Sequence, residues 1–98
     1  MAKIKFSAAA RKDLAAIDEY GAAQFGDEIA SEYARGFQVV FSLLGQYTLA
    51  GRLRSELREG TRCKVHRRHL IFYRFTDDTV FIQRILHHSQ DIPAHLRP

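Results

Sequence analysis

The sequence of 98 residues has a single cysteine, Cys63, and no long hydrophobic run. One cysteine excludes an internal disulfide and argues against a zinc site with cysteine ligands. No apolar stretch approaches the roughly 18 residues that a membrane span needs, and the N-terminal residues lack the hydrophobic region of a signal peptide. We therefore expect a soluble, cytoplasmic protein with no membrane partner, and a single domain over residues 1–98.

The motifs of common hydrolases and nucleotide-binding enzymes are also missing. There is no glycine-rich phosphate loop, no nucleophile elbow around Ser89, and no pair of carboxylates on one strand face. His87 and His88 are adjacent, so on a strand they point to opposite faces and cannot share a metal ion. His66 and His69 flank an expected turn that has no carboxylate nearby. We therefore expect no metal site, no cofactor and no classical hydrolase chemistry. An RNase stays open, because neighbouring strands supply basic and acid–base residue types: Arg62, Lys64, Arg84, His87 and His88.

Charge is present but unevenly distributed. Residues 1–51 have five basic and six acidic residues, whereas residues 52–98 have ten basic and five acidic residues, so the net charges are −1 and +5. A segregated positive charge attracts polyanions or an acidic partner. The alternative is a solvated basic face that only keeps the protein soluble.

The start of the chain shows first the hydrophobic pattern of a strand and then that of a helix. Residues 3–6 alternate polar and apolar side chains, which predicts a short strand with Ile4 and Phe6 facing inward. Ser7 is suited to cap a helix that follows, because its hydroxyl can satisfy a free backbone N–H. Helical spacing then begins at Ala8. The apolar stripe of this helix is Ala10, Leu14, Ile17, Gly21 and Phe25.

A second helix is predicted to follow with almost no linker. Gly26 can adopt the left-handed conformation that ends a helix, and Asp27 is placed to cap the next helix, which ends near Gly45. The apolar stripe of this second helix is Ala30, Tyr33, Phe37, Val40, Phe41 and Leu44. Two helices joined by so short a link form an antiparallel hairpin.

The second half of the chain has the period of strands. Residues 46–59 show no sustained period, and we expect an irregular excursion there. After Gly60, apolar and polar residues alternate with a period of two, which predicts strands at 61–67, 69–75 and 80–86. Asp77-Asp78 fits a two-residue turn between the last two strands. Within the strand at 61–67 we expect Cys63 and Val65 to face inward. The outward-facing side chains are then Arg62, Lys64 and His66.

These elements predict an α+β fold. An N-terminal strand precedes an antiparallel helix hairpin and a three-stranded antiparallel meander, with the helices packed on one face of the sheet. The strands have more apolar surface than one helix-facing layer can use, supplied by Leu70, Phe72, Phe75, Phe81 and Ile85. We expect the surplus to form a partner-binding face. The alternative is that residues 46–59 and the C-terminal tail fold over it.

Two strings of residues resemble those of a known family. The first is Phe6-Ser7, Ala10, Asp13-Leu14, Ile17, Tyr20 and Phe25-Gly26. The second, more specific string is Gly60-x-Arg62, His69-x-Ile71-Phe72-Tyr73-Arg74, Ile82-x-Arg84-Ile85-Leu86-His87, Asp91 and His95-Leu96. Over nearly its whole length the chain resembles the ParE branch of the ParE/RelE superfamily, the toxins of bacterial type II toxin–antitoxin modules.

The resemblance implies a cytoplasmic toxin that poisons DNA gyrase without a catalytic centre of its own, and a ParD-type antitoxin that neutralises it. Candidates for binding the target lie in the C-terminal half: Arg74, Arg84, His87, Asp91, His95 and Leu96. Candidates for binding the antitoxin are Arg62, Leu70, Phe72 and Phe81. An amphipathic, acidic antitoxin segment fits a basic receptor with apolar surface.

An alternative function comes from the RelE-like relatives, which cut mRNA on the ribosome with basic residues on the sheet and a tyrosine or histidine near the C-terminus. The nearest equivalents here are Arg62 and His87 or His88. The tail has no tyrosine, and the loop before the meander is rich in arginine rather than lysine, and both departures count against ribosomal cleavage. The strands also lack the paired aromatics of a base-stacking platform, so we expect no sequence-specific nucleic-acid binding by the chain alone.

Overall fold

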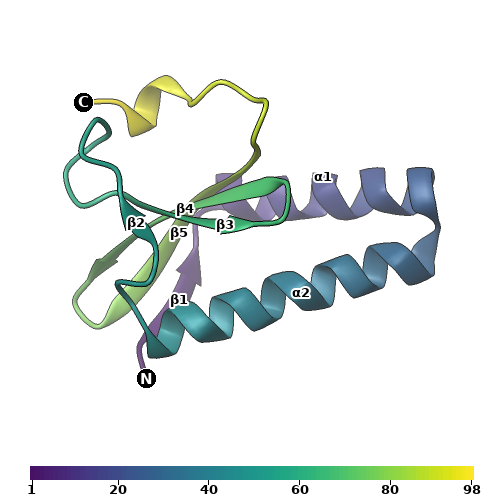
Figure 1. The fold of residues 1–98 in the computed structure, drawn as a ribbon, viewed down its shortest axis with the longest axis horizontal. Helices are drawn as coiled ribbons and strands as arrows, with labels where there is room; N and C mark the ends of the chain where they lie inside the picture. The colour runs from purple at the N-terminus through teal and green to yellow at the C-terminus, as the bar shows by residue number, and fades with distance from the viewer.

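The computed structural model describes residues 1–98 as two helices on one side of a five-stranded sheet (Figure 1). The elements are β1 (Lys3–Phe6), α1 (Ala8–Phe25), α2 (Asp27–Gln46), β2 (Arg52–Leu53), β3 (Arg62–His66), β4 (His69–Thr76), β5 (Thr79–His87) and the short helix η1 (Ala94–Leu96). The strand order is β1-β5-β4-β3-β2. The predicted α+β class, the helix hairpin and the meander are confirmed. Neither helix is long and apolar enough to cross a bilayer.

The sheet has two features that the sequence pattern did not predict. β1 pairs in parallel with β5, so the sheet is mixed, whereas all its other pairs are antiparallel. The segment at 46–59, expected to be irregular, contributes the two-residue edge strand β2, which pairs with β3. The predicted turn between β4 and β5 is confirmed, with positive φ angles of 51° at Asp77 and 57° at Asp78.

Ser7 joins the helical layer to the sheet. Its Oγ accepts a hydrogen bond from the N–H of Ala10 at 2.9 Å, which confirms the predicted cap. The same hydroxyl donates to the carbonyl of Gln83 in β5 at 2.7 Å. Ser7 therefore fixes the start of α1 over β5, in addition to satisfying a free N–H of the first turn.

The link between the helices is a single residue, Gly26, with φ of 88°. Asp27, predicted as the cap of α2, is instead its first helical residue, and Gly26 occupies the cap position without a side-chain bond. The prediction was wrong by one position because glycine alone supplies the positive φ that reverses the chain. Asp27 and Glu28 then lie in the first turn, where a negative charge interacts favourably with the helix dipole.

The main core lies between the helices and the sheet. Its buried members are Ala10, Phe37, Phe41, Leu44, Ile71, Tyr73, Val80, Ile82 and Ile85. The predicted stripe of α2 faces this core, and Ile4 and Phe6 of β1 pack against it. Phe25 was predicted to belong to the stripe of α1, but its side chain is 62% exposed. That prediction was wrong because the connected ends of the helices extend past the sheet and leave Phe25 nothing to pack against (Figure 1).

A second, smaller core covers part of the opposite face of the sheet. It comprises Leu57, Cys63, Phe72, Leu86 and Leu96, with Leu70 and Ile92 packed against it. Residues 46–59 and the C-terminal tail therefore fold over this region, which was the alternative to a partner-binding face. A backbone bond from the N–H of Arg58 to the carbonyl of Leu96, 2.8 Å long, joins the loop to the tail.

The prediction for the faces of β3 is confirmed for the burial of Cys63 and wrong for Val65 and His66. His66 packs against Phe37 of α2, with ring centroids 4.7 Å apart, so it faces the helices rather than solvent. Cys63 is buried in the second core, and Val65 is 60% exposed instead of facing inward. The alternation of the strand is correct, but a period of two does not say which of its faces the helices cover.

Candidate functional site

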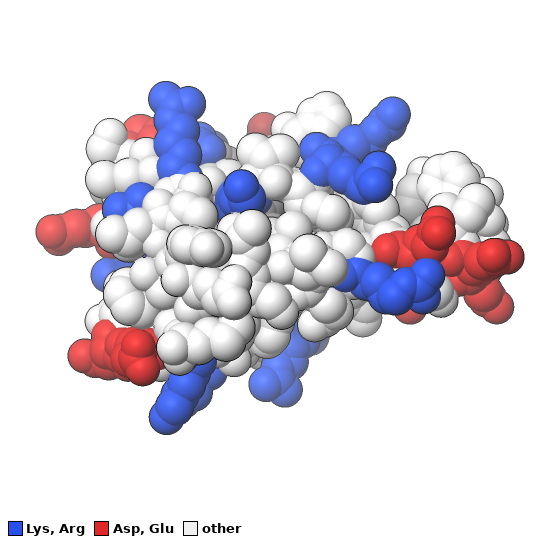
Figure 2. All heavy atoms as spheres, turned by 60° about the horizontal axis from the view of Figure 1, so that its bottom comes forward, with Lys and Arg blue, Asp and Glu red and all other residues white.

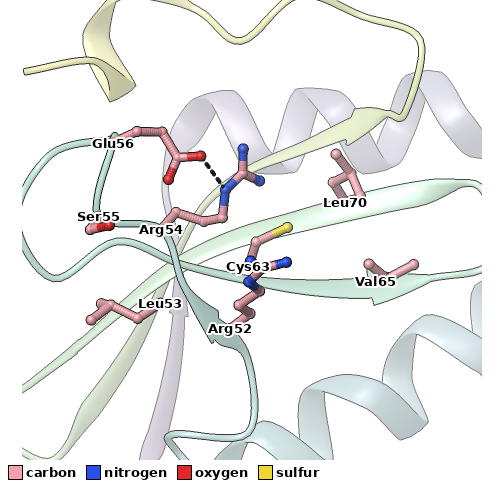
Figure 3. Close-up of a pocket in the computed structure, with 8 residues that line it drawn as sticks. All are labelled: Arg52, Leu53, Arg54, Ser55, Glu56, Cys63, Val65 and Leu70. Carbon is pink, nitrogen blue, oxygen red and sulfur yellow. Dashed lines mark hydrogen bonds and ion pairs between the residues drawn. The ribbon is translucent and has the colours of Figure 1, made fainter.

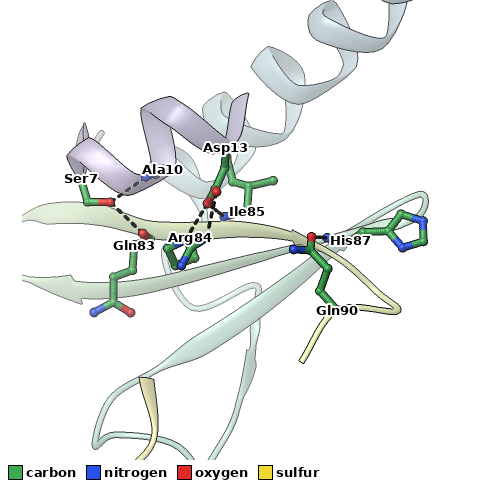
Figure 4. A network of polar contacts seen from close by, with 8 residues as sticks. All are labelled: Ser7, Ala10, Asp13, Gln83, Arg84, Ile85, His87 and Gln90. Atoms are coloured by element: carbon green, nitrogen blue, oxygen red, sulfur yellow. Dashed lines mark hydrogen bonds and ion pairs between the residues drawn. The ribbon is translucent and has the colours of Figure 1, made fainter. Parts of the chain in front are cut away.

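Arg84, a predicted target-binding residue, is held within the fold (Figure 4). Its Nε and Nη2 donate to the two carboxylate oxygens of Asp13 in α1, at 2.8 and 2.9 Å. Asp13 also accepts a bond from the N–H of Ile85 at 2.9 Å. The hydrogen bond to Asp13 raises the pKa of Arg84. Both side chains are mostly buried, so this pair joins α1 to β5 and does not present a free cation to a partner.

Arg62 also forms hydrogen bonds within the fold, to backbone carbonyl groups. Its Nη1 donates to the carbonyl of Gly51 at 2.9 Å and lies 3.4 Å from that of Leu49. The hydroxyl of Tyr73 accepts a bond from the N–H of Gly51 at 2.8 Å and donates to the carbonyl of Thr48 at 2.9 Å. Arg62 and Tyr73 therefore hold the segment before β2 from two directions. This role for Arg62 differs from the antitoxin contact or catalytic group expected from the sequence.

The remaining predicted residues do not form one surface. Leu96 and Phe72 are 1% and 0% exposed, because the tail and loop cover them, so neither side chain can be reached by a partner in this conformation. Arg74, Asp91 and His95 are exposed, and no ion pair joins Arg74 to Asp91.

Their positions along the sheet are also far apart. Arg74 lies opposite Phe81, and His87 lies opposite His69, at the other end of β4. The two pairs are therefore about 17 Å apart, at roughly 3.3 Å per residue. Phe81, an antitoxin-binding candidate, is 37% exposed and sits beside Arg74 rather than beside Leu70.

Four histidines meet at one end of the sheet, and we call His66, His69, His87 and His88 the histidine cluster. His66 is opposite His69 in the β3–β4 pair, and His69 is opposite His87 in the β4–β5 pair. The rings of His87 and His88 have centroids 4.4 Å apart. The expectation that they point to opposite faces was wrong, because β5 ends at His87 and the chain turns there, with the His87 N–H donating to Gln90 Oε1 (Figure 4).

Tyr33 of α2 completes this cluster. Its hydroxyl is 2.6 Å from Nδ1 of His69, and its ring lies 5.5 Å from that of His66. The sequence had placed Tyr33 in the core stripe only. Nothing local in the sequence could have revealed the contact, because Tyr33 and His69 lie on separate elements 36 positions apart.

Protonation of His66 and His69 is disfavoured. Burial lowers the pKa of His66, and the positive charge of Arg67 lowers it further. Burial also lowers the pKa of His69, as do His87, His66 and His88. The Nε2 atom of His66 is buried without a hydrogen-bond partner. No group of three or more histidine, cysteine, aspartate or glutamate side chains is arranged to hold a metal ion.

The cluster makes stability depend on pH. The native pKa of both histidines lies below the unfolded value of about 6.5, so the unfolded chain binds more protons as the pH falls through 6.5. The stability that these neutral rings provide is complete above that pH and is lost below it. We expect the urea midpoint to fall between pH 7.5 and pH 5.5, and to fall less in His66→Phe. His95→Asn, on the exposed tail, should behave as the wild type; equal losses in all three proteins would contradict this assignment.

A shallow groove lies on the face of the sheet away from the helices (Figure 3). Its volume is about 330 Å³. We call it the basic groove; its lining includes Arg52, Leu53 and Arg54 from the β2 region, Cys63 and Val65 from β3, and Leu70 from β4. Only Leu70 among these was predicted to bind a partner. The others were missed because the groove exists only once β2 has paired with β3.

The groove combines apolar surface with positive charge. Leu53 and Val65 are 51% and 60% exposed. Arg54 Nε donates to Glu56 at 2.9 Å, and its guanidinium lies 5.9 Å from the centre of the Phe72 ring. Burial raises the pKa of the Cys63 thiol, so this residue lines the groove as a neutral group and not as a thiolate nucleophile. Chemically, the groove suits an apolar side chain flanked by carboxylates.

The chain matches known proteins over nearly its whole length. Residues 4–92 match the family described as ParE toxin of type II toxin-antitoxin system, parDE. The chain is 33% identical over 96 residues to Toxin ParE1 of Caulobacter vibrioides, a match that covers 98% of this chain and 99% of the relative.

Solved structures share the fold. A structure of the chromosomal ParDE system from P. aeruginosa matches with a TM-score of 0.76 and 24% identity, over 89% of this chain and 96% of the other. The E. coli DinJ–YafQ complex matches with a TM-score of 0.56 and 18% identity, over 91% and 96%. These likenesses show the fold, whereas the family model and the ParE1 relative show the family. The chain therefore belongs to the ParE toxin family of type II toxin–antitoxin systems.

Proposed function

We propose that this protein is a cytoplasmic toxin that inhibits DNA gyrase by stabilising its cleaved-DNA complex, and that a ParD-type antitoxin neutralises it. The observation that carries the proposal is the match of residues 4–92 to the ParE toxin family. The relative ParE1 and the fold shared with a ParDE structure support the same conclusion.

The position of the basic residues supports a toxin that acts by binding. Arg62 donates to the backbone of the segment before β2, and it lies four residues from His66 along β3. This separation is about 13 Å at 3.3 Å per residue. His66 is at the same end of the sheet as His87, so Arg62 and His87 are at different positions along the sheet. This separation counts against their acting on one phosphate and favours binding.

The basic groove supports an acidic antitoxin segment as partner. Arg52 and Arg54 line it, Arg54 paired with Glu56 at the same groove, and the exposed side chains of Leu53 and Val65 offer apolar contact area. Apolar anchors supply most of the affinity in such complexes, and charged rims set orientation and association rate. Of the antitoxin candidates from the sequence, Leu70 belongs to this groove, and we retain it for that role.

The proposal is tested with purified toxin, gyrase and supercoiled plasmid. We expect linear DNA to accumulate after detergent and protease treatment, in proportion to toxin concentration, because a stabilised cleavage complex releases broken DNA when the enzyme is denatured. Toxin that has been incubated with its antitoxin is the control and should yield no linear DNA. Undiminished supercoiling and no cleavage at saturating toxin would contradict gyrase as the target.

One observation favours a ribosome-dependent endoribonuclease as the second candidate. Tyr33 and His69 are hydrogen-bonded at 2.6 Å beside Arg67 and Arg68, which places acid–base groups and cations at one end of the sheet. Primer extension on mRNA from expressing cells separates the two functions. Cuts at fixed codon positions that disappear in His69→Gln would support cleavage, whereas intact transcripts during growth arrest support gyrase.

A further inference from the structure

The connected ends of α1 and α2 extend beyond the sheet (Figure 1). They bear three large apolar side chains that the fold leaves exposed: Tyr20 at 65%, Phe25 at 62% and Ile29 at 54%. Tyr20 and Phe25 lie in the last six residues of α1, and Ile29 is the third residue of α2. At 1.5 Å per residue, all three are within about 10 Å of the end of the hairpin. We call these three residues the hairpin tip.

The segment that forms the hairpin tip is acidic. Residues 14–34 contain five carboxylates and no lysine or arginine, so this segment has a charge of −5 in a chain of +4, and the remainder has +9. The carboxylates are Asp18, Glu19, Asp27, Glu28 and Glu32. Figure 2 shows acidic side chains gathered at the end of the molecule on the right, beside uncoloured surface and next to a basic side chain. None of the five takes part in an ion pair.

The fold does not require this combination. Asp27 and Glu28 interact favourably with the dipole of α2, but Glu19 and Glu32 lie outside the first turn of either helix. Phe25 is the last residue of α1, where a polar residue would serve the helix equally well. Single exposed apolar residues are ordinary, whereas three at one projecting end of an acidic segment indicate a contact surface.

The chemistry of the tip defines its partner. Two aromatic rings and an isoleucine can enter an apolar pocket, and the surrounding carboxylates match a rim of lysine and arginine. Five negative charges repel DNA phosphates and an acidic antitoxin segment, both of which the basic remainder of the molecule attracts. The tip therefore fits a basic protein surface, and its charge is opposite to that of the basic groove.

We infer that the hairpin tip is the surface by which this toxin docks onto its protein target, through a basic surface with an apolar pocket. This inference rests on the proposed function in that the chain acts as a toxin, but it does not require the target to be gyrase. It assigns target recognition to the N-terminal half, and it leaves the basic groove free for the antitoxin.

The test uses two tip variants and one matched control. Phe25→Ser with Ile29→Ser removes apolar surface. Glu19→Lys with Glu32→Lys reverses the charge of two side chains and leaves the three apolar side chains in place. Val39→Ser is the control, because Val39 is a 68% exposed apolar residue of α2 away from the tip. Urea unfolding establishes that each variant is folded, and the charge-reversal pair keeps the test valid if the serine pair aggregates.

Two measurements are made on each protein, growth arrest on induction without antitoxin and the concentration that gives half-maximal gyrase cleavage. Each tip variant should require at least ten-fold more toxin for arrest, a change of about 1.4 kcal/mol in binding, while Val39→Ser matches the wild type. If the wild type arrests growth without gyrase cleavage, gyrase is excluded, and the arrest assay still tests the tip. Arrest by both tip variants at wild-type levels, or no arrest by the wild type, would overturn the inference.

Discussion

Replacing Asp13 by alanine is expected to lower the free energy of unfolding by about 3 kcal/mol, the low end of the range for breaking a buried ion pair. The carboxylate accepts two bonds from Arg84 and one from the N–H of Ile85. Its removal leaves a guanidinium that is only 20% exposed without a partner, and it frees a backbone donor in β5. For a domain of this size we expect the melting temperature to fall by on the order of 10 °C or more.

Asp18→Ala is the matched control for this loss. Asp18 is an exposed aspartate of the same helix with no ion pair, so its replacement should change stability by less than about 0.5 kcal/mol. A double variant, Asp13→Ala with Arg84→Met, should recover part of the loss, because no unpaired charge is left near the core. Urea unfolding followed by circular dichroism measures all three. A midpoint for Asp13→Ala equal to that of Asp18→Ala would show that the pair does not stabilise the fold.

The second large effect is expected at Gly51. A Cβ there would lie 2.5 Å from Cε1 and 2.7 Å from the hydroxyl of Tyr73, which is fully buried and cannot move aside. The hydroxyl also bonds the Gly51 N–H and the Thr48 carbonyl, so the loop cannot shift without breaking both bonds. Gly51→Ala should therefore cost about 2–3 kcal/mol. Burial raises the pKa of Tyr73, which keeps the phenol able to donate.

Gly21→Ala provides the control for the Gly51 prediction. A Cβ at Gly21 would meet the nearest atom, Cβ of Ala30, at 3.5 Å, which is ordinary contact. In a helix interior the change should stabilise the protein by up to about 1 kcal/mol. The two substitutions add the same methyl group and should shift the urea midpoint in opposite directions. A destabilisation at both positions would mean that the clash with Tyr73 is not the cause.

These effects bear on how toxicity data are interpreted. Arg84 and Arg62 were candidates for binding a partner, yet each is held by groups of its own chain. Loss of toxicity in Arg84→Ala would follow from lower stability before any effect on the target. Screens of this surface therefore need the soluble amount of each variant beside its activity.

Much of the fold follows from local patterns. The period of two before Ser7 and after Gly60 predicted the strands, and the helical period between them predicted the hairpin. Gly26 and the Asp77-Asp78 pair were identified as turns because their backbone angles suit few residues. The candidate site was predicted less well. Of the residues proposed for partner binding, Leu70 lies in the basic groove, while Phe72 and Leu96 are buried.

The sequence by itself determined the order of elements, the capping of α1 by Ser7 and the family to which the chain belongs, because these depend on neighbouring residues and on fixed spacings. Only the tertiary structure decided which face of β3 meets the helices, that the loop and tail cover Phe72, and that Tyr33 and the four histidines meet at one end of the sheet. The physical reason is that a period of two or of 3.6 fixes which residues share a face. What covers that face depends on pairing between segments that are distant along the chain.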